Sequence, residues 1–206
     1  MTSPADAIID LYQRHAATYD GLRGKLLMEG PWLARFRALL APDAAILDIG
    51  CGTGQPIARH LREQGHAVTG VDSAGAMIAL CRTRFPGGDW QVADMRHLAL
   101  GRRFGGLIAW DSFFHLTPED QPKMFPIFAA HADPGAALMF TSGPARGEVI
   151  GNFEGEALYH GSLDPQDYRA LLAENGFSVI DHVVEDQSCG GHTIWLAQAG
   201  LAQSAP

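Results

Sequence analysis

Short apolar runs alternate with amphipathic segments along most of the chain. Apolar runs bounded by turn residues are typical of buried strands, whereas apolar positions three and four residues apart are typical of helices. The pattern predicts helices over residues 5–18, 31–40, 56–65, 74–85, 117–132 and 164–176. It predicts strands over 44–50, 66–72, 89–94, 105–112, 136–143, 177–185 and 192–199.

This alternation of strands and helices is typical of right-handed βαβ units, and it predicts a doubly wound α/β sheet. The turn 186–191 between the last two strands is short, so one of them must run antiparallel to the other. A length of 206 residues fits one domain. We therefore expect a single domain over 1–206, with an N-terminal helical cap over 1–40 and a glycine-rich insertion over 143–163.

The helix expected over 117–132 contains residues that favour a helix start and one that should interrupt the helix. Thr117 has the side chain of an N-cap, and Pro118 suits the first helical position. Pro126 lies inside the same segment and is expected to kink or break the helix, because it lacks an N–H group.

Composition and charge limit the kinds of partner that the protein is expected to bind. Fifteen basic residues against 23 acidic ones give a formal charge of -8, which argues against nucleic acid, because phosphate contacts need clustered Lys and Arg. No apolar run reaches the ~18 residues of a membrane span, and the first residues do not resemble a signal peptide. The three scattered cysteines, Cys51, Cys81 and Cys189, suit a reducing compartment. We expect a cytoplasmic protein that binds neither nucleic acid nor membrane.

Carboxylates end the first four predicted strands. These are Asp48, Asp72, Asp94 and Asp111. Ligands of doubly wound sheets bind beyond the carboxyl ends of the strands. A single Asp there would only begin a turn, but four in succession favour a ligand surface over four independent turns.

The segment "ILDIGCGTGQP", residues 46–56, indicates what this surface binds. It has three glycines for a close backbone approach but no lysine for a nucleotide phosphate loop. Its G-x-G-x-G spacing is one residue short of the dinucleotide fingerprint. The carboxylates suit a ligand with ribose hydroxyls, an adenine amine and a cationic centre. S-adenosylmethionine is such a ligand.

The motifs together resemble the class I S-adenosylmethionine-dependent methyltransferases, over about residues 40–199. "LDIGCGTG", "VTGVDSAGAMIALCR", "VADM" and "LIAWDSFFHL" are similar to four successive family motifs, and "GHTIWLAQA" resembles the reversed last strand. "ATYD" (17–20) resembles the segment that covers the cofactor in the small-molecule branch. The resemblance implies a Rossmann-like sheet of order 3-2-1-4-5-7-6, with strand 7 antiparallel and helices on both faces.

The resemblance also implies the residues that hold the cofactor. Asp72 would bind the ribose, Asp94 would read the adenine edge, and Trp110 would lie near the sulfonium. The full predicted set is Tyr19, Asp48, Gly50, Cys51, Gly52, Gly54, Asp72, Ser73, Met77, Asp94, Met95 and Trp110. For Met77, Met95, Trp110 and Cys51, packing in the core is the alternative role.

Candidates for the chemistry lie at the same edge of the sheet. His115 follows the fourth strand, and Tyr159 and His160 lie in the insertion. We expect these three to position or deprotonate the methyl acceptor, with residues 143–163 acting as a mobile lid. The histidines on strands, His182 and His192, are interpreted as structural, and no metal site is expected.

Two functions remain open from the sequence. The first is methyl transfer to the oxygen or nitrogen of a small-molecule acceptor, with S-adenosylhomocysteine as product, by a monomer or homodimer. The second is binding of S-adenosylmethionine or S-adenosylhomocysteine without turnover. An NAD-dependent oxidoreductase is disfavoured by the glycine spacing.

Overall fold

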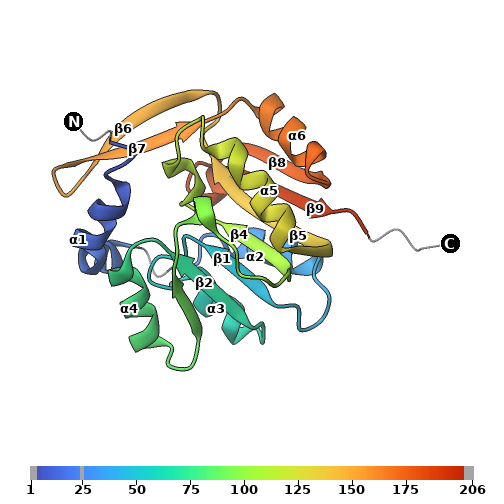
Figure 1. Cartoon of the computed structure of the whole chain (residues 1–206), viewed down its shortest axis with the longest axis horizontal. Helices are drawn as coiled ribbons and strands as arrows, with labels where there is room; N and C mark the ends of the chain where they lie inside the picture. The colour runs from blue at the N-terminus through green and yellow to red at the C-terminus, as the bar shows by residue number, and fades with distance from the viewer. Residues whose placement is uncertain (1–3, 24–25, 202–206) are drawn as a thin grey trace.

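A seven-stranded sheet forms the centre of the molecule, with helices against both faces (Figure 1). The computed structural model describes residues 4–23 and 26–201. Residues 1–3, 24 and 25 of the predicted cap, and 202–206 of the predicted domain, lie outside this description. Within the described residues no helix is both long enough and apolar enough to span a membrane.

The helices are α1 (Ile8–Leu22), α2 (Gly30–Ala38), α3 (Ile57–Glu63), α4 (Gly75–Arg84), α5 (Gln121–His131) and α6 (Pro165–Glu174), with 3-10 turns η1 (Met95–His97), η2 (Phe113–His115) and η3 (Gln187–Cys189). The strands are β1 (Ile46–Ile49), β2 (Val68–Asp72), β3 (Asp89–Val92), β4 (Phe104–Ala109), β5 (Ala132–Ser142), β6 (Gly147–Phe153), β7 (Glu156–Ser162), β8 (Phe177–Asp186) and β9 (His192–Ala199).

The order of the sheet confirms the sequence prediction. Its strands follow β3-β2-β1-β4-β5-β9-β8, in which β8 and β9 are the sixth and seventh strands expected from the sequence. Strands β1 to β5 pair in parallel, and β9 runs antiparallel to both β5 and β8. The carboxyl ends of β1, β2, β3 and β4 therefore meet at one edge, where a doubly wound sheet binds its ligand.

The period-two alternation of strand side chains divides the core into two layers. In β1, Leu47 and Ile49 pack with Phe125 and Tyr168 of α5 and α6, whereas Ile46 packs with α2, α3 and α4 on the other face. The same alternation continues through β4, β5 and β9. A stacked pair in the first layer, Phe140 and Trp195, has ring planes only 4° apart.

The glycine-rich insertion expected over 143–163, where no strand was predicted, contains a β-hairpin. Strands β6 and β7 pair in register from Gly147↔Ser162 to Phe153↔Glu156 and form a separate two-stranded sheet. Both turn residues, Glu154 and Gly155, have positive φ, as a tight hairpin turn requires. The signal that could have found the hairpin is this Glu-Gly pair between two runs of strand-forming residues.

The helix before β5 also differs from its prediction. It begins at Gln121 rather than after Thr117, whose carbonyl accepts hydrogen bonds from the backbone N–H groups of Asp120 and Gln121. The buried Gln121 side chain is fixed by donating to the carbonyls of Leu116 and Gly161, both at 2.9 Å. Pro126 does not break the helix. Pro126 is exposed, so the carbonyl that it leaves without a partner lies toward solvent.

Helix α1 and the β6–β7 hairpin lie together above the ligand edge (Figure 1). Glu156 at the start of β7 joins them, because it accepts from His15 at 2.7 Å and from Arg14. Backbone angles at His15 are non-helical, so α1 bends at this contact. The two elements that were expected to act as cap and lid are therefore tied to each other.

The glycine loop after β1 packs tightly against the loop after β4. Gly50 has φ +74°, and a Cβ placed there would lie 2.2 Å from Cβ of Ser112. Ser112 itself donates to the carbonyl of Ile49 at 2.7 Å. At Gly52, which also has positive φ, an added Cβ would meet only the Tyr19 ring at 3.4 Å. The loops after β1 and β4 thus approach each other only because Gly50 has no side chain.

We predict that Gly50→Ala destabilises the protein more than Gly52→Ala. Both variants strain a positive φ, at ~1–3 kcal/mol, but only Gly50→Ala adds a steric clash, which costs a further ~1–3 kcal/mol. Urea unfolding of the two variants and the wild type measures the difference. Equal losses of free energy of unfolding would show that the Ser112 contact does not constrain the loop.

Candidate functional site

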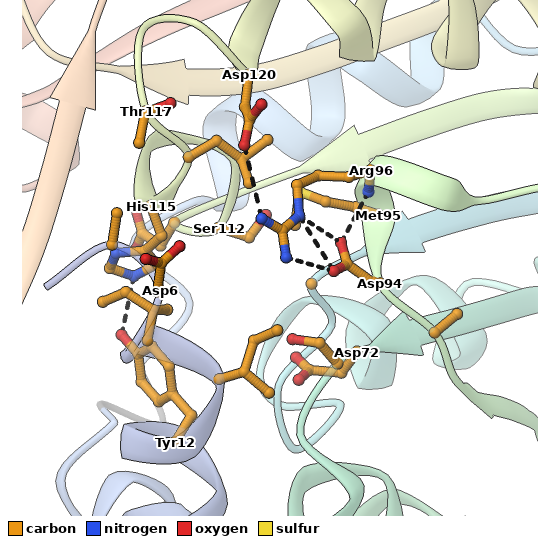
Figure 2. Close-up of a pocket in the computed structure, with 18 residues that line it drawn as sticks. Asp6, Tyr12, Asp72, Asp94, Met95, Arg96, Ser112, His115, Thr117 and Asp120 are labelled. Carbon is orange, nitrogen blue, oxygen red and sulfur yellow. Dashed lines mark hydrogen bonds and ion pairs between the residues drawn. The ribbon is translucent and has the colours of Figure 1, made fainter. Parts of the chain in front are cut away.

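A cavity of about 760 Å³ lies at the ligand edge, between α1 and the loops after β1, β2, β3 and β4 (Figure 2). This first cavity lies at the edge where doubly wound sheets bind their ligands. Six of the residues predicted from the sequence line it: Gly50, Asp72, Ser73, Asp94, Met95 and His115. The wall opposite the sheet comes from α1 and includes Tyr12.

Asp72 connects two of the loops that form this cavity. Its Oδ2 accepts from the backbone N–H of Gly52, and its Oδ1 accepts from that of Ala74, both at 2.9 Å. Burial raises the pKa of the Asp72 carboxyl, and the two N–H groups act in the opposite direction. Each carboxylate oxygen can accept more than one hydrogen bond, so Asp72 retains capacity for a ligand hydroxyl.

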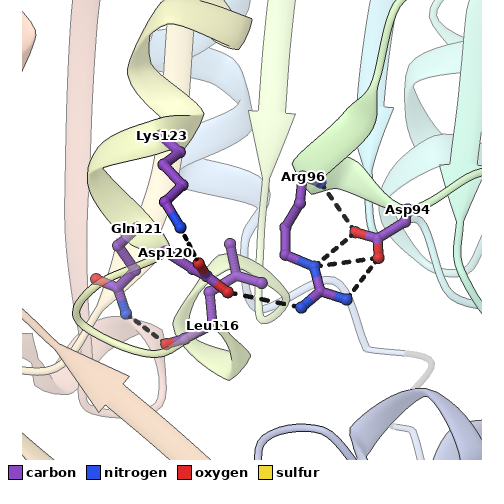
Figure 3. A network of polar contacts seen from close by, with 6 residues as sticks. All are labelled: Asp94, Arg96, Leu116, Asp120, Gln121 and Lys123. Atoms are coloured by element: carbon purple, nitrogen blue, oxygen red, sulfur yellow. Dashed lines mark hydrogen bonds and ion pairs between the residues drawn. The ribbon is translucent and has the colours of Figure 1, made fainter.

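In the loop after β3, Arg96 lies between two carboxylates (Figure 3). Its guanidinium donates to both oxygens of Asp94, at 2.6–3.1 Å, and approaches Asp120 at 3.5 Å. Burial acts to raise the pKa of Asp94, but the hydrogen bonds from Arg96 lower it overall. Lys123 also contacts Asp120, at 2.6 Å. Arg96 therefore uses part of the hydrogen-bonding capacity of Asp94, the carboxylate that was expected to bind the adenine edge.

A second cavity, of about 570 Å³, adjoins the first. It is lined by Tyr12, Tyr19, Arg23, Asp111, Phe114, His115, His160 and His192. Tyr12, Asp111 and His115 line both cavities. These three side chains mark the junction where a ligand in one cavity would meet a ligand in the other.

His115 is held in a single tautomer by its contacts. Its Nδ1 lies 2.7 Å from the carbonyl oxygen of Tyr159, so Nδ1 carries the proton. Its Nε2, 3.0 Å from the hydroxyl of Tyr12, then accepts from that hydroxyl. Burial lowers the pKa of His115 to about 4, and burial raises that of Tyr12. The pair is therefore neutral at physiological pH, with the Tyr12 oxygen at the cavity junction.

The imidazole of His160 is less constrained by contacts than that of His115. It extends from β7 into the second cavity, where its ring centroid lies 5.0 Å from those of Phe114 and His115. Burial lowers its pKa, so the ring is neutral near pH 7. A neutral imidazole at a cavity wall can take up a proton.

Asp111 and His192 contact each other at the junction. The sequence analysis placed Asp111 on the expected ligand surface without a specific role, and it placed His192 outside the site. The Nε2 of His192 lies 2.9 Å from Oδ1 of Asp111, and the hydrogen bond to Asp111 raises the pKa of His192. His192 was interpreted as structural because it begins a strand. Tyr12 was missed as well, although it lies seven residues before Tyr19 and therefore on the same helix face.

Several predicted residues lie outside both cavities. They are Asp48, Cys51, Gly52, Gly54, Met77, Trp110 and Tyr159. Asp48 and Trp110 fall on the strand face that packs toward α2 and α3, so alternation buries them below the edge. Burial raises the pKa of Asp48 to about 7.

Met77, Cys51 and Tyr159 are buried for similar reasons. Met77 packs beneath α1 with Ala16 and Ala74, and Cys51 packs among core residues of the second layer. Tyr159 packs against Ile8 and Leu11 of α1, so it is its backbone carbonyl that reaches His115. Gly52 lies beneath the ring of Tyr19. The roles predicted for these residues in ligand binding stay predictions.

Metal ligands do not cluster at this edge. Across residues 4–23 and 26–201, no group of three or more His, Cys, Asp or Glu side chains could hold a metal ion.

Comparisons with known proteins connect this geometry to a family. Residues 46–135 match a family described as "Methyltransferase domain". A dTDP-3-amino-3,6-dideoxy-alpha-D-glucopyranose N,N-dimethyltransferase of Streptomyces fradiae is 34% identical over 98 residues, 47% of this chain but only 38% of the relative. A dTDP-3-amino-3,4,6-trideoxy-alpha-D-glucopyranose N,N-dimethyltransferase of Streptomyces venezuelae is 27% identical over 81% of this chain and 76% of the relative.

Solved structures share the fold at lower identity. CcbJ methyltransferase from Streptomyces caelestis superposes with a TM-score of 0.71 at 18% identity, over 90% of this chain and 96% of the other. CalS10, an amino pentose methyltransferase from Micromonospora echinaspora with bound S-adenosylmethionine, gives 0.69 at 22% identity over the same shares.

We predict that His115 makes the protein less stable as the pH falls. The pKa of His115 in the folded protein, about 4, lies below the ordinary value of about 6.5. Between these pH values His115 is therefore protonated in the unfolded chain and neutral in the folded protein. The contribution is complete above pH 6.5 and is lost toward pH 4, by on the order of 3 kcal/mol.

Urea unfolding of the wild type and His115→Gln at pH 7 and pH 4.5 isolates this effect, because the other titrating groups are common to both proteins. Gln can donate to Tyr159 and accept from Tyr12, but it does not titrate. The wild type should lose more stability between the two pH values. An identical loss in both proteins would contradict the assignment of a neutral His115.

Proposed function

We propose that this chain is a class I S-adenosylmethionine-dependent methyltransferase and that it methylates an amine nitrogen of a small polar acceptor. The observation that carries the proposal is the pair of adjoining cavities that share Tyr12, Asp111 and His115. Transfer between two bound molecules requires that arrangement, because the reacting atoms must be held in line.

The first cavity suits S-adenosylmethionine. Gly50 presents backbone without a side chain at the cavity wall, and Asp72 retains acceptor capacity for ribose hydroxyls. Asp94 and Met95 lie where the adenine would be read, and a ligand amine there would share Asp94 with Arg96. When bound, this cofactor supplies a methyl group on a positively charged sulfur.

The acceptor would enter the second cavity. Tyr12 and His115 would hold it at the junction, and His160 would receive the proton that an amine releases. Held there, the neutral amine would offer its nitrogen lone pair to the methyl group that S-adenosylmethionine would supply, and the sulfur would keep the electron pair of the broken bond. The neutral imidazole of His160 would take up the one proton that the amine must release.

Nitrogen is favoured over oxygen by two observations. Both Streptomyces relatives are named as N,N-dimethyltransferases of amino sugars. Two histidines of the second cavity, His115 and His160, are weak bases with lowered pKa values. A weak base suits an amine more than a hydroxyl, because a protonated amine loses its proton far more readily than a neutral hydroxyl does.

Binding and turnover test the proposal in turn. S-adenosylhomocysteine should bind in titration calorimetry and NAD should not. Methyl-labelled S-adenosylmethionine, offered with nucleotide-linked amino sugars and their hydroxyl counterparts, should label only the amines. Labelling of the hydroxyl compounds alone would make this an O-methyltransferase. Binding without turnover of any acceptor would favour the non-catalytic alternative.

Asp72→Ala is expected to weaken S-adenosylhomocysteine binding roughly ten- to a hundredfold, because the ligand loses hydrogen bonds to a charged acceptor worth ~1.5–3 kcal/mol. Calorimetry on the folded variant measures this. Because Asp72 also holds Gly52 and Ala74, circular dichroism and the unfolding midpoint must accompany the titration. An unchanged dissociation constant would remove Asp72 from the ligand site.

His160→Ala is expected to lower turnover ~10²–10⁴-fold with an identified acceptor, because the proton loses its receiving base. His115→Ala should lower it as well, through loss of the Tyr12 contact. Affinity for S-adenosylhomocysteine should stay unchanged in His160→Ala. His60→Ala, on α3 outside both cavities, is the control. Full turnover in both histidine variants would mean that alignment alone accelerates the reaction.

A further inference from the structure

Asp111 has an unusual position in the chain. It follows β4 and has φ +49°, a left-handed conformation that few residues with a side chain adopt. Its side chain lines both cavities, at the junction where methyl transfer would occur. Strained backbone conformations of this kind persist where surrounding contacts hold them, and they are frequent at functional sites.

Neighbouring elements fix the Asp111 carboxylate. Its backbone N–H donates to Oγ1 of Thr141 at 2.9 Å, and the hydroxyl of Thr141, on β5, lies 3.5 Å from Oδ1. His192, at the start of β9, donates to the same oxygen at 2.9 Å. His192 is itself held, because its Nδ1 donates to the carbonyl of Cys189 at 2.7 Å and its ring packs on Trp110.

The second oxygen of this carboxylate is left for a ligand. All of the contacts above use Oδ1 or the backbone, and Oδ2 has no hydrogen-bond partner within residues 4–23 and 26–201. The side chain is 24% exposed, and both of its neighbouring spaces are the cavities. A fixed carboxylate with one free oxygen can accept a charge-assisted hydrogen bond.

Charges around the second cavity favour a cation over an anion as the ligand of Asp111. Arg23 contacts Glu29, which is fully buried, so its charge is matched. The lowered pKa values of His115 and His160 leave both rings neutral near pH 7. His192 donates to Asp111, and this hydrogen bond raises the pKa of His192, so His192 offers no free positive charge to a ligand. No unmatched positive charge among the lining residues would attract an anionic group.

We propose that Asp111, held in place by His192, binds the ammonium form of the acceptor amine at the junction of the two cavities. The bound ammonium gives one proton to the neutral imidazole of His160, which frees the nitrogen lone pair for methyl transfer, and the methylated product leaves as an ammonium. This inference rests on the proposed function and names its substrate class as protonated amines. Asp111 is the binding residue. His192 acts through it and is a positioning residue.

Sinefungin tests this without knowledge of the acceptor. It is an S-adenosylmethionine analogue in which a carbon bearing an ammonium group replaces the methylated sulfur, so its ammonium would project into the junction. Sinefungin and S-adenosylhomocysteine share all other contacts. The ratio of their dissociation constants therefore reports the environment of the ammonium.

Wild-type protein should bind sinefungin roughly ten- to a hundredfold more tightly than S-adenosylhomocysteine in calorimetry at pH 7. Asp111→Asn should abolish most of this preference and leave S-adenosylhomocysteine affinity unchanged. His192→Phe should reduce the preference, whereas His192→Gln should restore it, because the Gln amide can donate to Asp111.

Asp89→Asn is the matched control. Asp89 also accepts from a threonine, Thr69 at 3.0 Å, and from a cation, Arg102, but it lines neither cavity. Its variant should keep the sinefungin preference. Equal affinities in the wild type, or a preference that survives Asp111→Asn, would overturn the inference while the proposed function stands. If neither compound binds the wild type, both fall together.

Discussion

The geometry of the ligand edge depends on one buried carboxylate. Asp72 accepts backbone N–H groups from the loops after β1 and β2, and Ser112 joins the loop after β4 to the first of them. Without these contacts the buried donors of Gly52 and Ala74 would lack partners, at ~1–3 kcal/mol each. The missing side chain of Gly50 lets the loops close on each other. Both cavities are built on this joined edge.

Elements far from the sheet complete the site by covering it. Helix α1 contributes Tyr12 and the β6–β7 hairpin contributes His160, and Glu156 ties the two elements through His15. The hydrogen bonds of His115 to Tyr12 and to the carbonyl of Tyr159 then connect the cover to the sheet. Movement of the cover would therefore disturb the tautomer of His115, which couples access to the cavities with the protonation state of the site.

Local signals in the sequence predicted the alternation of strands and helices and the edge at which the first cavity lies, whereas the order of the strands was implied by the resemblance to the methyltransferase family. Strand and helix periods, turn residues and the glycine loop lie within short segments. The hairpin was missed because glycine content outweighed its weaker alternation. Trp110, directly after β4, packs in the second core layer, and its expected place near the sulfonium stays a prediction. Asp111 and His192 lie 81 positions apart in the sequence, and only the antiparallel pairing of β9 with β5 brings them together.

The polar groups gathered at this edge are difficult to explain by stability alone. Three histidines, two tyrosines, Arg23 and Asp111 surround one cavity, and the indole Nε1 of Trp110 has no hydrogen-bond partner among the described residues. Buried polar atoms without partners destabilise a fold, so an apolar cluster would have been more stable here. The aromatic side chains around Phe140 and Trp195 stabilise the face of the sheet that α5 and α6 cover. Departures from stable packing are expected where a protein binds and transforms a ligand, which identifies this edge as the functional part of the molecule.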